Sequence, residues 1–133
     1  MIENYIVKGL SHIGIRTHQL QESVDYYVNN FGFEMFYKKR INGLDCWFIE
    51  KHGLILEFVD SGAEVPKTEG VIYHISFEVV GIEALVAELK EKGVIPAELE
   101  ISVAEDFFPA GMKNIFFYGI NGEKIELFEM TSK

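Results

Sequence analysis

The stretch SHIGIRTHQLQESVDYYVNNFGFE, residues 11–34, decides the fold because a strand in it is followed at once by an amphipathic helix. The strand belongs to a run rich in β-branched residues, residues 5–16. Apolar residues at helical spacing then share one face: Leu20, Val24, Tyr27, Val28 and Phe31. Gly32 follows them and is typical of a helix end.

Three apolar runs follow this helix, and each has the length of a strand: residues 33–39, 44–50 and 54–60. Asn42-Gly43 separates the first two runs and His52-Gly53 the last two, and both pairs are typical of hairpin turns. The first half therefore predicts one βαβββ module over about residues 5–60.

The same order returns after a polar connector at residues 61–70. A strand at residues 71–80 precedes a helix face formed by Ile82, Leu85, Val86 and Leu89, with Gly93 at its end. Three candidate strands follow at 94–103, 113–118 and 123–130, the last two joined at Asn121-Gly122. We expect a second βαβββ module over about residues 71–130, and a single domain over the 133 residues.

The duplication places the same side chains in both halves. His12 and His74 lie at the start of the two modules, and Glu57 and Glu126 lie inside the apolar closing strands. A buried glutamate requires a positive partner. Singly, a core histidine or a solvent-facing glutamate is the commoner explanation. Together, two imidazoles and two carboxylates predict a transition-metal site with an open position for water or substrate.

The acidic composition makes some classes of binding partner improbable. The net charge is −9 with no basic run, which disfavours nucleic acid and anionic membranes. The start of the chain lacks a signal-peptide pattern, so we expect a soluble cytoplasmic protein.

The remaining cysteine and histidines are expected to lie outside the site. Cys46 lies in an apolar run and is expected to be a buried structural thiol. His18 and His52 have no duplicate in the other module and are expected at the surface.

In this order and spacing, four segments resemble the vicinal oxygen chelate superfamily of glyoxalases, bleomycin resistance proteins and dioxygenases: SHIGIRTHQLQESVDYYVNNFGFE, ILEFVD, YHISFEV and NGEKIELFE. The resemblance covers about residues 8–130. It implies an α+β fold in which two βαβββ modules form a cupped eight-stranded mixed sheet. It also implies a homodimer that binds a small-molecule substrate.

Within the superfamily, the sequence is most similar to glyoxalase I (lactoylglutathione lyase), whose metal ligands are His, Glu, His and Glu in the order of His12, Glu57, His74 and Glu126. This similarity implies a nickel, cobalt or zinc lyase of methylglyoxal detoxification. It would act on a hemithioacetal or similar α-oxygenated carbonyl substrate through an enediolate, with glutathione or another thiol as co-substrate. Glu126 is the first candidate base and Glu57 its counterpart. Arg16 resembles an arginine that binds the thiol.

Some residues depart from glyoxalase I. Asp60 and Ser61 occupy the stretch where that enzyme has an asparagine for glutathione, and residues 105–113 are acidic and aromatic, so glutathione adducts are expected to be modest substrates. Fosfomycin-modifying enzymes use three ligands and do not need Glu57, and methylmalonyl-CoA epimerases normally have Gln there.

Two alternatives stay open: an epimerase of that kind, or a protein that only binds a small molecule in an aromatic cavity lined by Trp47, Phe107, Phe108 and Tyr118. Core packing is the commoner role of such aromatic residues. The exact substrate and thiol, the native metal, and whether one chain or two complete each site also stay open.

Overall fold

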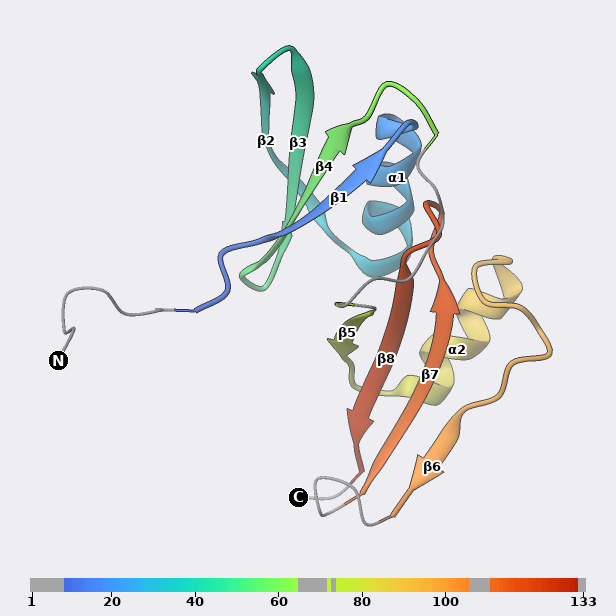
Figure 1. Cartoon of the computed structure of the whole chain (residues 1–133). Coiled ribbons are helices and arrows are strands. Elements are labelled where there is room, and N and C mark those ends of the chain that lie inside the picture. Colours follow the sequence, from blue (N-terminus) through green and yellow to red (C-terminus); the bar gives the residue numbers. More distant parts are fainter. Residues whose placement is uncertain (1–8, 65–71, 73, 106–110, 132–133) are drawn as a thin grey trace, which may run out of the picture. The chain divides into compact units, whose positions relative to one another are not determined.

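The computed structural model describes residues 9–64, 72, 74–105 and 111–131. The chain divides into two compact units, Met1–Val65 and Pro66–Lys133, and the boundary falls inside the predicted connector. Each unit contains one helix and one four-stranded sheet (Figure 1). No helix in the described part of the chain is long and apolar enough to span a membrane.

The first unit has the predicted β-α-β-β-β order: β1 (Ile13–Thr17), α1 (Leu20–Phe31), β2 (Glu34–Ile41), β3 (Leu44–Lys51) and β4 (Leu54–Asp60). The strands lie in the order β1-β4-β3-β2, with β1 and β4 parallel and the other pairs antiparallel. Both hairpin turns have positive φ at their two central residues, for example 53° at Asn42 and 79° at Gly43. This geometry confirms the predicted Asn-Gly and His-Gly turns.

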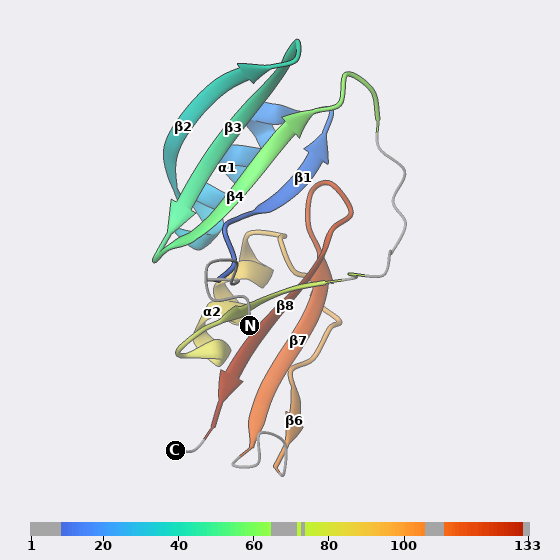
Figure 2. The same cartoon turned by 60° about the vertical axis from the view of Figure 1, so that its left-hand side comes forward.

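The core of the first unit lies between α1 and one face of its sheet (Figure 2). Tyr27 of α1 is fully buried, and its ring centroid lies 5.5 Å from that of Phe58 and 5.7 Å from that of Phe33. Because side chains alternate along a strand, Leu56 and Phe58 face this core and Glu57 faces the opposite side of the sheet. The core therefore determines which face carries the carboxylate.

The second unit repeats this topology with β5 (Ile75–Glu78), α2 (Ile82–Glu91), β6 (Ser102–Ala104), β7 (Met112–Tyr118) and β8 (Lys124–Met130). Its strand order is β5-β8-β7-β6, and β5 and β8 are parallel. Ile125 and Leu127 are fully buried on the side of α2, which leaves Glu126 on the other face. The α+β class with two βαβββ modules is confirmed. The joint eight-stranded sheet concerns the arrangement of the two units and stays a prediction.

The strand predicted at residues 94–103 is wrong over most of its length, since only Ser102–Ala104 forms a strand there. Pro96 has no backbone N–H to donate. The backbone N–H groups of Val94 and Ile95 both donate to the Leu89 carbonyl, which folds this segment onto the end of α2. Ile95 is buried there as a core residue and not as a strand residue.

The connection at Asn121-Gly122 is also longer than predicted. The Gly119 N–H donates to the Glu123 carbonyl at 2.7 Å, so β7 and β8 are joined by a five-residue loop instead of a two-residue turn. The predicted strands at 5–16 and 71–80 shorten to β1 and β5, and residues 5–8, 71 and 73 lie outside the described residues.

Candidate metal centre

The first predicted pair, His12 and Glu57, lies together in the first unit. His12 directly precedes β1, and Gly14 of β1 is the register partner of Glu57 in β4. The distance from His12 Nε2 to Glu57 Oε1 is 3.2 Å. A Cβ atom built on Gly14 would lie 3.6 Å from Glu57 Oε1, so the glutamate reaches across the backbone of β1 towards the histidine.

The second predicted pair, His74 and Glu126, has the same arrangement in the second unit. His74 directly precedes β5, and Ser76 of β5 is the register partner of Glu126 in β8. The distance from His74 Nε2 to Glu126 Oε1 is 3.4 Å, and Glu126 is 8% exposed. Each unit therefore presents one imidazole and one carboxylate at one end of a parallel strand pair.

A phenylalanine accompanies each pair, which sequence reasoning missed. Phe48 of β3 is opposite Glu57, and Phe116 of β7 is opposite Glu126. Their rings meet the histidine rings edge to face, at centroid distances of 6.0 Å for His12 and 5.2 Å for His74. Counting back from the His52-Gly53 turn pairs Phe48 with Glu57, whereas the two-residue turn predicted at Asn121-Gly122 would have paired Phe117, and not Phe116, with Glu126.

Asn114 is a second residue that sequence reasoning missed. Its side-chain Nδ2 donates to Glu126 Oε2 at 2.8 Å, and both residues are buried. The sequence signal is a single amide within the apolar strand β7. One oxygen of Glu126 therefore contacts an amide donor, and the other faces His74.

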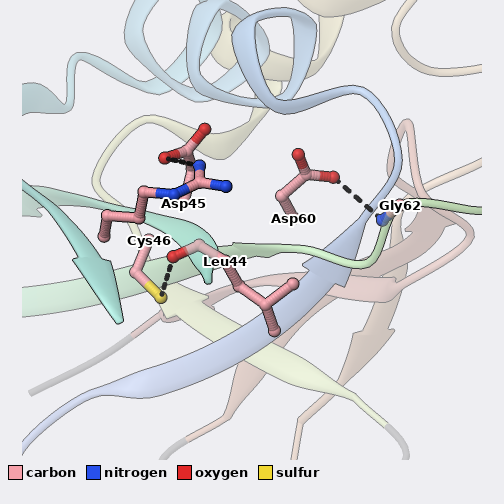
Figure 3. Close-up of polar contacts among 6 residues, drawn as sticks. Leu44, Asp45, Cys46, Asp60 and Gly62 are labelled. Atoms are coloured by element: carbon pink, nitrogen blue, oxygen red, sulfur yellow. Dashed lines mark hydrogen bonds and ion pairs between the residues drawn. The ribbon is translucent and has the colours of Figure 1, made fainter. Parts of the chain in front are cut away.

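Cys46 occupies the place in the first unit that corresponds to Asn114. Burial raises the pKa of the Cys46 thiol above its ordinary value, and the nearby Glu57 carboxylate raises this pKa further. The thiol donates to the Leu44 carbonyl oxygen, with the sulfur atom 3.8 Å from it. Figure 3 shows this contact as a dashed line. The prediction that Cys46 is buried is confirmed, and a raised pKa favours its neutral thiol form.

The donor pairs fit a transition metal. Donors lie about 2.0–2.2 Å from such an ion, so two adjacent donors in tetrahedral or octahedral geometry are about 3.0–3.5 Å apart. The distances of 3.2 and 3.4 Å fall in this range. Among the residues that the structure describes, no group of three or more His, Cys, Asp or Glu could hold an ion. The set of four ligands, two from each unit, therefore stays a prediction.

The comparisons with known proteins assign the family. The sequence profile of the Glyoxalase/Bleomycin resistance protein/Dioxygenase superfamily matches residues 9–127. The chain belongs to this superfamily. A search of curated proteins gives no match.

Solved structures agree with the superfamily fold. A glyoxalase family protein from Enterococcus faecalis is 26% identical, with a TM-score of 0.69 over 92% of this chain and 98% of that one. The fosfomycin resistance protein FosX from Listeria monocytogenes is 21% identical, with a TM-score of 0.73 over 95% and 96%. FosX in complex with Mn(II) and sulfate is 20% identical, with a TM-score of 0.70 over 95% of each chain.

The other residues predicted for the site differ in whether they share a sheet face with the His–Glu pairs. Arg16 is exposed and shares the sheet face of Gly14 and Glu57, two residues further along β1. Tyr118 shares the face of Glu126 and is exposed. Trp47 is opposite Phe58 and lies on the other face of the sheet, with Lys38 Nζ 3.9 Å from its ring centroid, which agrees with a packing role and not with a place beside Glu57. Phe107 and Phe108 lie outside the described residues.

Asp60 and Ser61, which follow Glu57 in the sequence, form hydrogen bonds that hold the end of β4. Asp60 Oδ1 accepts a hydrogen bond from the Gly62 N–H at 3.0 Å (Figure 3). The Ser61 hydroxyl donates to the Thr17 carbonyl at 3.0 Å, which ties the end of β4 to the end of β1. His18 and His52 are exposed, as predicted.

Proposed function

We propose that this superfamily member is a metal-dependent enzyme of the glyoxalase I type, in which His12, Glu57, His74 and Glu126 bind one divalent transition metal. The observation that carries the proposal is the repeated pair: an imidazole nitrogen and a carboxylate oxygen 3.2 Å apart in one unit and 3.4 Å apart in the other. Both distances suit two donors on one ion, and the repetition of the pair in the two units supports a shared role.

A metal bound there would act as a Lewis acid towards an oxygen of the substrate. The protein's own part is proton transfer. Glu126 is the first candidate base, because its Oε1 is directed towards the histidine while Oε2 is held by Asn114. A carboxylate held in this way can take a proton from one carbon of the substrate and return it to the next.

The substrate we propose is a small α-oxygenated carbonyl compound, such as a hemithioacetal. Arg16 lies on the face of Glu57 and provides a cation for an anionic group of the substrate. Asp60 is engaged with Gly62 and is an anion, so it would not bind a carboxylate of glutathione. We therefore propose that glutathione adducts are modest substrates.

Fosfomycin modification is a second candidate, favoured by the likeness to FosX, which has been solved in complex with Mn(II). Fosfomycin-modifying enzymes use three metal ligands, so a site of that type would not need Glu57 as a ligand. Its contact with His12 therefore favours the glyoxalase I type. A protein that only binds a small molecule would show no turnover with either substrate.

Metal loading and substrate assays test the proposal. Purified protein is treated with a chelator, titrated with Ni²⁺, Co²⁺, Zn²⁺ and Mn²⁺, and assayed with fosfomycin and with methylglyoxal hemithioacetals of glutathione and smaller thiols. We expect bound metal and turnover of a hemithioacetal, and loss of the metal in His12→Ala and His74→Ala. His18→Ala is the matched control, since His18 is exposed and should not affect uptake. Wild-type protein that takes up none of these ions would contradict the proposal.

A further inference from the structure

The two carboxylates of the pairs have unequal surroundings. Glu126 is 8% exposed and accepts a hydrogen bond from the Asn114 amide, so its two oxygens have different neighbours. Glu57 faces a thiol at the corresponding place, and a thiol is a weak donor compared with an amide. The two units therefore differ at one position beside the glutamate, which is Asn114 in the second unit and Cys46 in the first.

The sheet registers establish that these two positions are equivalent. Phe48 is opposite Glu57, and Cys46 lies two residues earlier in β3, opposite Val59. Phe116 is opposite Glu126, and Asn114 lies two residues earlier in β7, opposite Phe128. Since residues two apart on a strand share a face, Cys46 and Asn114 each lie on the face of the neighbouring glutamate. Only the second unit has an amide there.

We propose that Asn114 is a positioning residue that orients Glu126 for metal binding, and that the first unit has only a weaker equivalent, because the thiol of Cys46 contacts Glu57 in place of an amide. This inference rests on the proposed metal site. By holding Oε2, the amide directs Oε1 towards His74. The amide is uncharged, so it satisfies the buried oxygen and leaves the negative charge of Glu126 for the metal.

Known metal sites indicate how much the loss of the Asn114 amide should weaken metal binding. Residues that hydrogen-bond to a metal ligand typically contribute about 10–100-fold to metal affinity. We expect Asn114→Leu, which has a similar shape and no donor, to weaken Co²⁺ binding by about 10–100-fold. The matched variant Cys46→Ala should change the affinity by less than about threefold, because a thiol contributes only a weak hydrogen bond.

A double-mutant cycle separates positioning from general packing. If Asn114 acts through the Glu126 carboxylate, Asn114→Leu should have little further effect on Co²⁺ affinity when Glu126 is already alanine. If Asn114 only supports the packing of β7, its effect should be the same in both backgrounds. Asn114→Asp keeps the shape of the side chain and replaces the donor by a second carboxylate, so it should also lose affinity. It serves as the second variant where Asn114→Leu does not fold.

The experiment is a Co²⁺ titration of the full chain, followed by visible absorption and by competition with a chelator. Weak binding in the Asn114 variants, near-normal binding in Cys46→Ala and a non-additive cycle would support the inference. Normal affinity in both Asn114 variants, or an additive cycle, would overturn the positioning role while leaving the metal site in place. Absence of Co²⁺ from the wild-type protein would overturn the metal site, and the positioning role with it.

Discussion

At the scale of the residue, the two glutamates are the most informative side chains. Each follows a buried residue on its strand and faces away from the core, beside a histidine and a phenylalanine that come from distant parts of the unit. A carboxylate in such surroundings requires compensation. The protein supplies an amide to Glu126, and we propose a metal for both.

Glu126→Gln tests the proposed base. Glutamine keeps the size of the side chain and an oxygen that can bind the ion, but it cannot accept the substrate proton. We expect kcat to fall by about a hundredfold to ten-thousandfold, with much of the bound metal retained. Steady-state kinetics on metal-loaded protein measure the change.

Glu78→Gln is the control for this experiment, because Glu78 lies in β5 opposite Phe128, on the same face as Glu126, and is exposed. Its kinetics should equal those of the wild type. An unchanged rate in Glu126→Gln, with activity that still requires metal, would transfer the role of base to Glu57 or to water.

At the scale of the element, the two faces of β8 have different functions, because successive side chains of a strand point to opposite faces. Glu126 lies on the site face, whereas Glu129 lies on the helix face and accepts hydrogen bonds from the Gly81 and Ile82 N–H groups, at 3.1 and 2.9 Å. These N–H groups lie at the start of α2, where the helix dipole favours a negative charge. The strand that carries the candidate base thus also anchors the helix behind it.

Glu129→Ala should therefore destabilise the protein. Loss of a side-chain cap typically lowers the free energy of unfolding by about 0.5–2 kcal/mol. Glu91→Ala is the control, because Glu91 is exposed at the opposite end of α2, where a negative charge is unfavourable. Urea denaturation of both variants measures the difference. Equal stability of Glu129→Ala and the wild type would show that α2 needs no cap from β8.

At the scale of the whole molecule, each unit provides only half of the proposed ligand set. A single ion bound by both pairs would be present once per chain. Because such an ion binds the folded chain alone, it stabilises the fold, by about 2.7 kcal/mol at a concentration a hundred times its Kd.

We therefore expect one Co²⁺ per chain and a rise in the unfolding temperature on loading. Both effects should be lost in His12→Ala and also in His74→Ala, although the two histidines belong to different units. Metal analysis and calorimetry of the loaded variants measure this. Two ions per chain, or half of the uptake in each variant, would indicate separate sites in the two units.

The sequence by itself determined the β-α-β-β-β order of both units, the end of α1 at Gly32 and the turns at Asn42-Gly43 and His52-Gly53. These features depend on neighbouring residues: the period of apolar side chains and the ability of Asn, His and Gly to adopt positive φ. Comparing the two halves also located each histidine and glutamate of the candidate site, because a duplicated module repeats its chemistry at the same place.

Only the tertiary structure decided what surrounds these four residues. Phe48, Phe116 and Asn114 become neighbours of the pairs through strand registers, which join positions distant along the chain. The same registers placed Trp47 on the opposite face, and hydrogen bonds from Val94 and Ile95 to Leu89 fold the start of the predicted strand at 94–103 onto the end of α2. Local patterns predict that a strand exists, but the pairing of strands selects which side chains meet, because side chains alternate and a shift by one residue reverses the face.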